Sequence, residues 1–246
     1  MQDTSNFVVL GASGGIGYSL CRRLSEAGHR VFVVGRDQEK TQRLGEELGA
    51  PWTTCDATDA ESVASCIEAA DRELGRIDGA AHCVGSLLLK PGHLTSAADW
   101  GQTVATNLSS AFYLLRAVIP KMRKSGGSLV FLSSAAARIG LANHEAIAAA
   151  KAGVQGLTIS AAATYGPQGI RVNCVAPGLV DTPLANRITS NEQSLKASQS
   201  MHVLGRIGRA EDVASAIHWL LDGNQSWVTG QVIGVDGGLG VVRSRG

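Results

Sequence analysis

The first stretch with a recognisable chemical pattern is a run of glycines near the N-terminus. Gly11-Ala-Ser-Gly-Gly-Ile-Gly17 follows an apolar segment at 7–10 and begins a segment of helical periodicity. Free backbone N–H groups and the helix dipole converge at such a helix start and bind phosphate oxygens, and side chains there would block the approach. We therefore interpret the loop as a nucleotide phosphate site rather than an ordinary glycine-rich turn. Its spacing is GxxxGxG, not GxGxxG.

The cysteines and histidines predict neither a metal site nor a disulfide framework. The five cysteines (21, 55, 66, 83 and 174) are odd in number and form no CxxC pair, and the six histidines form no HxH or HExxH spacing. This pattern is typical of a reducing cytosol. No basic segment precedes the first apolar stretch, so we expect no signal peptide and a cytoplasmic protein.

The elements that would position these residues alternate along the chain. Short apolar runs predict strands at 7–10, 30–34, 52–55, 79–84, 128–132, 171–175 and 231–235. Helical periodicity predicts helices near 15–27, 38–48, 60–75, 97–124, 145–165 and 210–221. Strand and helix in alternation predict an α/β fold, a doubly wound parallel sheet with helices on both faces. The polar stretch 178–209 shows no clear strand and is expected to be mobile, with a substrate lid at about 183–203.

Composition limits the class of protein. The chain has 246 residues, no repeat and no linker, which predicts one domain over 1–246. Its net charge of +1 favours binding to neither nucleic acid nor anionic membranes. Hydrophobic residues make up 44% and charged residues 17%, which excludes a disordered chain. The apolar runs are too short to predict a membrane span.

Several further motifs follow the glycine loop, and their order along the chain is more specific than any one of them. They are Asp56 after the third predicted strand, Asn107, Ser133-Ser134, Lys151, Asn173-Cys-Val-Ala-Pro-Gly178-Leu-Val-Asp-Thr182, Leu204-Gly-Arg-Ile-Gly-Arg-Ala-Glu-Asp212 and Thr229-Gly-Gln-Val-Ile-Gly-Val-Asp-Gly-Gly238. With the glycine loop, they make the chain resemble the short-chain dehydrogenase/reductase family over nearly its whole length. The resemblance implies a single Rossmann domain, a small-molecule substrate and a homotetramer.

The resemblance also implies which residues hold a nicotinamide dinucleotide. Beyond the catalytic residues Asn107 and Lys151, these are Gly11, Ser13, Gly15, Ile16, Gly17, Arg36, Asp56, Ala57, Gly85, Pro177, Gly178, Val180 and Thr182. Asp56 would meet the adenine ring, although a polar turn at a strand end is the alternative. Val180 and Thr182 would face the nicotinamide carboxamide and the pyrophosphate. His82-Cys83-Val84-Gly85 stands where the family usually has Asn-Asn-Ala-Gly, so only the glycine is kept.

Cofactor choice depends on the end of the second strand. Members of the family that prefer NAD(H) place an acidic residue at the position of Gly35, where it accepts from the ribose 2′-hydroxyl. Gly35 cannot do so, and Arg36 follows with a guanidinium whose charge and fork suit a 2′-phosphate. A solvated surface charge is the alternative for Arg36. Asp37 is interpreted as the N-cap of the next helix. The sequence thus favours NADP(H) over NAD(H).

The catalytic residues depart from the family pattern. The resemblance implies a serine that binds the substrate oxygen, an asparagine in a water relay, and a lysine that lowers the pKa of a tyrosine four residues before it. Ser134, Asn107 and Lys151 match these positions, but Ile147 stands where the tyrosine is expected. The remaining tyrosines, Tyr18, Tyr113 and Tyr165, fall on predicted helices elsewhere.

Two interpretations of this departure remain open. In one, Lys151 only holds the nicotinamide ribose, and the chain is a catalytically silent NADP(H)-binding protein that acts as a sensor or partner subunit. In the other, His144 replaces the phenol as proton donor, because 144, 147, 148 and 151 share a helical face and imidazole titrates near neutral pH. Some divergent enoyl-thioester reductases of the superfamily carry their tyrosine seven residues before the lysine, which is the position of His144. We therefore expect an NADP(H)-dependent oxidoreductase with an atypical active site, acting on a carbonyl or a conjugated enoyl substrate.

Overall fold

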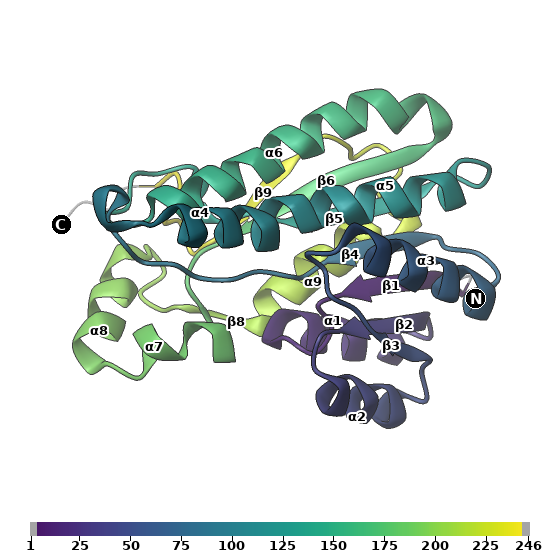
Figure 1. Ribbon diagram of the computed structural model, residues 1–246, viewed down its shortest axis with the longest axis horizontal. Helices are drawn as coiled ribbons and strands as arrows, with labels where there is room; N and C mark the ends of the chain where they lie inside the picture. Colours follow the sequence, from purple (N-terminus) through teal and green to yellow (C-terminus); the bar gives the residue numbers. More distant parts are fainter. Residues whose placement is uncertain (1–3, 243–246) are drawn as a thin grey trace.

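Seven parallel strands form one sheet at the centre of the molecule. The computed structural model describes residues 4–242, and Figure 1 shows the sheet between two layers of helices. The strands are β1 (Asn6–Leu10), β2 (Arg30–Gly35), β3 (Trp52–Thr54), β4 (Gly79–His82), β5 (Gly127–Leu132), β6 (Ile170–Pro177) and β9 (Val232–Val235), in the order β3-β2-β1-β4-β5-β6-β9. All seven predicted strands and the doubly wound fold are confirmed.

The apolar strands are explained by burial on both faces of the sheet. Along β1, Phe7 and Val9 pack against one helical layer, while Val8 and Leu10 pack against the other, because successive side chains point to opposite faces. The first layer contains α1 (Gly15–Glu26), α2 (Gln38–Leu48) and α9 (Ala210–Leu221). The second contains α3 (Ala60–Leu74), α5 (Ser110–Met122) and α6 (Glu145–Tyr165).

The direction in which strands are added to the sheet reverses between β1 and β4, and the candidate site lies at this point. The chain runs from β1 to β2 and β3 on one side, then returns to β4 on the other side of β1. Loops that leave β1 and β4 in opposite directions open a crevice at the carboxyl ends of the strands. The glycine loop follows β1 and therefore lies at this crevice.

The helix predicted over 97–124 is interrupted by a π-helical turn. It consists of α4 (Ala97–Val104), a π-helical segment (Ala105–Ser109) and α5. The side chain of Asn107 donates to the carbonyl of Thr103, the acceptor that a regular α-helix would assign to the backbone N–H of residue 107. The side chain thus competes with the regular helical hydrogen bond inside the turn that carries Asn107.

The polar stretch 178–209 is more regular than the sequence predicts. It contains a 3-10 turn (Pro183–Ala185), α7 (Asn186–Thr189) and α8 (Glu192–Met201), and β7 (Val180–Asp181) pairs in parallel with β8 (Gly208–Arg209). Asn191 caps α8 by accepting from the backbone N–H of Ser194. The expectation of a stretch without strands was wrong, because residues 28 positions apart pair only in the folded chain.

One segment among the described residues, Glu145–Gln168, has the length and hydropathy of a membrane-spanning helix, which the apolar runs of the sequence did not indicate. It is α6 with the turn that follows. One face of α6 is buried in the layer beside β6 and carries Ile147, Lys151 and Val154. The apolar character of this segment is therefore that of a core helix.

Candidate active site

The glycine loop is bare of side chains because its surroundings leave no room for them. Gly11 has a φ of +88°, and a Cβ there would lie 2.7 Å from the carbonyl carbon of Cys83, after β4. A Cβ on Gly15 would lie 2.6 Å from Cγ2 of Thr182. Gly14 caps α1 without any side-chain hydrogen bond to the helix. The first turn of α1 therefore presents its N–H groups to the crevice, as phosphate binding requires.

At the end of β2, the surroundings of Gly35 leave no room for an acidic side chain, and the next residue, Arg36, is an exposed cation. A Cβ on Gly35 would collide with the Thr41 hydroxyl and lie 2.7 Å from the Ser13 hydroxyl. The Thr41 hydroxyl cannot easily move, because it donates to the carbonyl of Asp37 at 2.5 Å. Arg36 is exposed and forms no ion pair among residues 4–242. Asp37 caps α2 by accepting from Lys40 N, which confirms that interpretation.

Asp56 and Ala57 lie just after β3, and the Asp56 carboxyl is close enough to Arg36 to feel its charge. One carboxylate oxygen of Asp56 accepts from the hydroxyl and the backbone N–H of Thr58, at 2.7 and 2.9 Å. These hydrogen bonds, with a smaller contribution from the charge of Arg36, lower the pKa of the Asp56 carboxyl. Ala57 is buried. The geometry is that of a polar turn with its other carboxylate oxygen available to a ligand.

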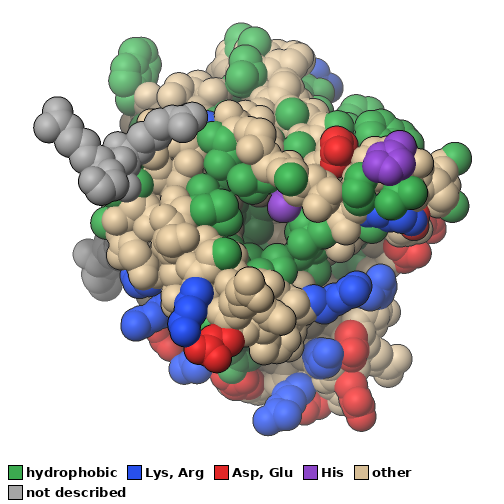
Figure 2. Space-filling model, turned by 90° about the vertical axis from the view of Figure 1, so that its left-hand side faces the viewer, with side chains coloured by type: hydrophobic (Ala, Val, Ile, Leu, Met, Phe, Trp, Pro, Cys, Tyr) green, Lys and Arg blue, Asp and Glu red, His purple; other side chains and the backbone are tan. Residues whose placement is uncertain are grey.

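A cavity of about 250 Å³ joins the glycine loop to the predicted catalytic residues. Figure 2 shows the face at the carboxyl ends of the strands, where hydrophobic side chains surround a central hollow. The predicted residues that line the cavity are Gly15, Ile16, Gly85, Asn107, Ser134, Ile147, Lys151, Pro177, Gly178, Val180 and Thr182. Gly11, Ser13, Gly17, Arg36, Asp56 and Ala57 lie outside its lining, along the glycine loop and the ends of β2 and β3.

Lys151 is a buried cation, and its ammonium has one hydrogen-bond partner among residues 4–242. Its Nζ donates to the carbonyl of Leu132 at 2.9 Å, and the residue is 6% exposed. Burial lowers the pKa of Lys151 to about 8, because desolvation penalises the ammonium. The ammonium lies 3.6 Å from the position that a Cβ on Gly85 would occupy, so a glycine there keeps the approach open.

Asn107 faces Lys151 across Gly85. Its amide nitrogen donates to the Ser86 hydroxyl at 2.8 Å as well as to Thr103, and its Oδ1 accepts from Ser86 N at 3.1 Å. The amide is therefore held on three sides and stands 3.3 Å from the Cβ position of Gly85. The structure thus brings Asn107 and Lys151 to the same glycine, Gly85.

The two serines that close β5 have different environments. Ser134 lines the cavity, and its Oγ accepts from Ala136 N at 3.1 Å, which leaves the hydroxyl proton free to donate. Ser133 is buried, and its hydroxyl donates to the backbone carbonyl of Lys151 at 2.9 Å while it accepts from Gln155. Ser133 thereby ties β5 to α6, a role that the sequence did not reveal.

The structure separates Ile147 from His144. Ile147 is 4% exposed and lines the cavity, one helical turn before Lys151. His144 is the N-cap residue of α6, its Nδ1 lies 2.7 Å from the carbonyl of Ala142, and it does not line the cavity. The expected sharing of one helical face fails because the helix begins only at Glu145. Tyr18, Tyr113 and Tyr165 lie in α1, α5 and α6, outside the cavity lining.

His82 occupies the interior beside this site. Its Nε2 lies 2.8 Å from the Ser110 hydroxyl, which is itself 2.6 Å from the Thr106 carbonyl, so Ser110 donates to Thr106 and accepts from Nε2–H. Its Nδ1 is buried with no hydrogen-bond partner among the described residues. Burial, reinforced by the charge of Lys151, lowers the pKa of His82 to about 3. His82 is therefore a neutral part of the core.

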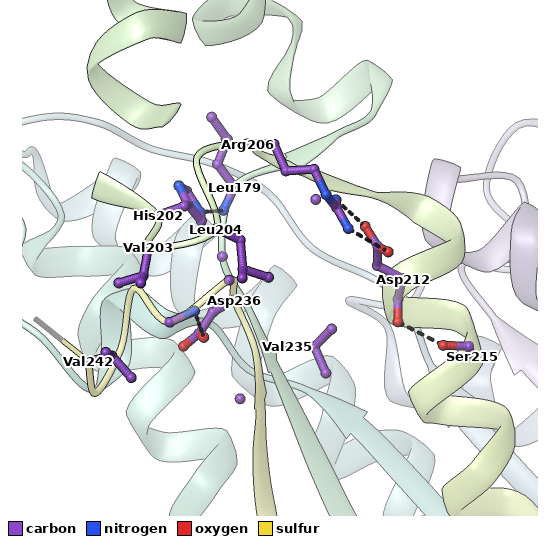
Figure 3. Close-up of a pocket in the computed structure, with 15 residues that line it drawn as sticks. Leu179, His202, Val203, Leu204, Arg206, Asp212, Ser215, Val235, Asp236 and Val242 are labelled. Atoms are coloured by element: carbon purple, nitrogen blue, oxygen red, sulfur yellow. Dashed lines mark hydrogen bonds and ion pairs between the residues drawn. The ribbon is translucent and has the colours of Figure 1, made fainter. Parts of the chain in front are cut away.

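A second cavity, of about 500 Å³, lies behind the loop that follows β6 (Figure 3). Gly178 and Leu179 line both cavities. His202, after α8, accepts from Leu179 N with Nε2 at 3.2 Å, and its Nδ1 lies 2.6 Å from the Ser198 carbonyl. A Cβ on Gly178 would lie 2.5 Å from that Nε2. His202 thus anchors the end of α8 to the wall of the active-site cavity, which no sequence motif indicated.

The chain matches a family model and several relatives over nearly its whole length. Residues 11–240 match a model described as enoyl-(acyl carrier protein) reductase. A tropinone reductase homologue of Arabidopsis thaliana is 33% identical over 243 residues, covering 96% of this chain and 93% of the relative. A cis-4-hydroxycyclohexanecarboxylate dehydrogenase of Sinomonas cyclohexanicum is 36% identical over 241 residues and covers 96% of both chains.

Solved structures agree with this match. A short-chain type dehydrogenase/reductase of Mycobacterium ulcerans is 32% identical and superposes with a TM-score of 0.94, covering 99% of this chain and 92% of the other. A variant of actinorhodin polyketide ketoreductase, solved with NADPH, has a TM-score of 0.93 at 27% identity and covers 98% and 99%. The similarity extends over essentially the entire length of each chain.

Proposed function

Because this chain belongs to the short-chain dehydrogenase/reductase family of oxidoreductases, we propose that it is an NADP(H)-dependent enzyme that reduces a carbonyl or a conjugated enoyl group. The observation that carries this proposal is the cavity that joins the glycine loop to Ser134 and Lys151. When bound, the cofactor supplies the hydride. The protein binds and orients both reactants and manages the proton.

The residues present fit a dinucleotide along the crevice. The loop at the start of α1 would accommodate a pyrophosphate, because Gly14 and Gly15 line the cavity without side chains and no side chain caps the first turn of the helix. Lys151 and Asn107 would hold the nicotinamide ribose beside Gly85. The exposed Arg36 favours a 2′-phosphate, and Gly35 removes the acidic partner that NAD(H) would use. The polyketide ketoreductase with a similar fold binds NADPH, which is compatible with this choice.

Nonpolar residues shape the rest of the active-site cavity. Val84, Leu87, Ile147, Leu179 and Leu184 contribute to its lining. Lys151 is the one cationic side chain in the lining. This composition favours an uncharged small-molecule substrate. Leu184 belongs to the 183–203 segment, which supports the proposal that this segment covers the substrate as a lid.

Steady oxidation of NADPH by the purified protein, over a panel of ketones, aldehydes and enoyl thioesters, tests the function. A second candidate, a catalytically silent NADP(H)-binding protein, is favoured by Ile147 and by the exclusion of His144 from the cavity. Tight NADPH binding without turnover of any substrate would support the silent protein. Turnover above the rate without enzyme would support the reductase.

We also propose that the protein is a cytoplasmic homotetramer. Phe112 on α5 and Ile159 on α6 are large apolar side chains exposed in the isolated chain, at 47% and 55%. Exposed apolar side chains of this kind are stabilised when a second copy covers them. Trp227, which precedes β9 in the chain, and Val241, which follows it, are further exposed apolar residues.

A further inference from the structure

The identity of the proton donor is the main chemical question that the missing tyrosine raises. Among the residues that line the active-site cavity, only Cys83 and Lys151 carry a titratable side chain. Burial raises the pKa of the Cys83 thiol to about 12, so that thiol is a poor acid near neutral pH. Ser134 carries a hydroxyl, which binds an oxygen well but gives up its proton only at high pH.

The other acids that the sequence offers do not reach the cavity. Ile147 has no proton to give. His144 sits at the start of α6 with Nδ1 against the Ala142 carbonyl. The three tyrosines lie in α1, α5 and α6 away from the lining. Elimination therefore leaves Lys151.

The geometry of Lys151 allows it to donate. An ammonium has three N–H groups, and the protein uses one of them, in the 2.9 Å bond to Leu132. Of the other two, one can meet the nicotinamide ribose, as proposed above, and one remains for the substrate. Lys151 and Ser134 line the same cavity, and with Ile147 in place of a phenol that lining contains no tyrosine, histidine or carboxylic acid.

We propose that Lys151 is itself the general acid, which transfers a proton from Nζ to the carbonyl oxygen of the substrate while Ser134 donates a hydrogen bond to the same oxygen. This inference rests on the proposed function. The carbonyl carbon gains the hydride, the carbonyl π electrons form the new O–H bond with the lysine proton, and the product is an alcohol. Lys151 is left as a neutral amine and regains its proton from water.

The protonation equilibrium of Lys151 suits this role. An acid works best when its pKa lies near the working pH. Burial brings the pKa of Lys151 down to about 8, so the residue carries its proton at neutral pH and can release it. The rate of ketone reduction should therefore be constant below about pH 8 and fall about tenfold per pH unit above it.

Two substitutions separate acid catalysis from cofactor binding. Lys151→Arg keeps the charge and the donors but holds its proton at every accessible pH. We expect it to lower ketone reduction about 10²- to 10⁴-fold while the Kd for NADPH changes only a few-fold. Lys151→Ala makes room for a small amine, and added methylammonium should restore part of the activity. Lys124→Arg, at an exposed position, is the matched control.

A measurement that needs no turnover completes the test. The rate at which acetic anhydride modifies Lys151, followed by peptide mass spectrometry against pH, reports the titration of the free protein, and we expect a midpoint near 8. A midpoint near the ordinary lysine value of about 10.4 would overturn the proposal. So would wild-type ketone reduction that Lys151→Arg leaves intact, or that His144→Ala alone abolishes. A wild-type protein that binds NADPH but reduces nothing contradicts the proposed function itself, whatever the titration shows.

Discussion

Ile147 and Lys151 lie one helical turn apart on the inner face of α6, and both side chains line the cavity that contains Ser134. The resemblance to the family implies a phenol at the first of these positions and an ammonium at the second. Here an apolar side chain stands beside the ammonium, so the cavity keeps its cation and loses its usual acid. This arrangement makes position 147 the most informative site for substitution.

Replacing Ile147 with tyrosine should increase ketone reduction. A positioned general acid contributes about 10²–10⁴-fold, and Ser134 and Lys151 are already in place around position 147. The initial rate of NADPH oxidation with a small ketone measures the effect. Ile147→Phe is the matched control, since it adds the ring without the hydroxyl. Equal rates for the two variants would contradict the prediction.

Removing the guanidinium of Arg36 should weaken NADPH binding selectively. A charge-assisted contact with the 2′-phosphate contributes about 1.5–3 kcal/mol, which corresponds to roughly 10- to 150-fold in Kd. Fluorescence titration of Arg36→Ala should show this loss for NADPH and none for NADH. Arg43→Ala serves as the control, because Arg43 is also exposed but lies on α2, beyond the end of β2. Equal affinities of the wild type for NADPH and NADH would refute the preference.

Acid should destabilise the protein partly through His82. Its pKa is near 3 in the folded state, against an ordinary value near 6.5. Between these values the unfolded chain binds a proton that the folded chain does not. The free energy of unfolding therefore falls by about 1.4 kcal/mol per pH unit as the pH decreases from 6.5 towards 3.

Urea unfolding at pH 7 and pH 5 tests this contribution at a fixed protein concentration. The wild type should lose about 2 kcal/mol more than His82→Asn over this interval, because asparagine does not titrate. An identical loss in the two proteins would assign acid sensitivity to other groups.

Loss of the His202 imidazole should loosen α8 and the wall of the active-site cavity. His202→Leu leaves the Leu179 N–H and the Ser198 carbonyl without their partner, at a cost of about 1–3 kcal/mol for each buried group. Faster amide hydrogen exchange in 192–203 and a higher KM should follow. His202→Gln, which can still offer an acceptor to Leu179, should show a smaller change. Unchanged exchange in His202→Leu would exclude the anchoring role.

Assembly should depend on the exposed apolar side chains of α5 and α6. Sedimentation at micromolar concentration should show a tetramer, or at least a dimer. Phe112→Glu and Ile159→Glu together should shift it towards the 25.5 kDa monomer, because burying carboxylates at an interface is costly. A wild-type monomer under these conditions would rule out the proposed assembly.

The local patterns of the sequence were sufficient to predict the fold. Strands buried on both faces are continuous apolar runs, and amphipathic helices repeat every three to four residues, so both leave a signal in adjacent residues. The Asp37 cap is also local, because it acts within one helical turn, and the glycine loop could be read from its place between a strand and a helix. The resemblance to the family, with the spacing along the chain, was enough to predict the roles of Ser134 and Lys151 and the position of Ile147.

Only the tertiary structure determined which residues contact one another in and around the cavity. The start of α6 at Glu145 turned His144 towards Ala142 and out of the cavity, and no spacing rule fixes a helix boundary to one residue. The contact of His202 with Leu179 joins positions 23 residues apart, and His82 reaches Ser110 across the core. Burial, and with it the low pKa of Lys151, is likewise produced by several elements packing together. Sequence neighbours determine secondary structure, whereas the chemistry of a buried group depends on distant segments that exclude water from it.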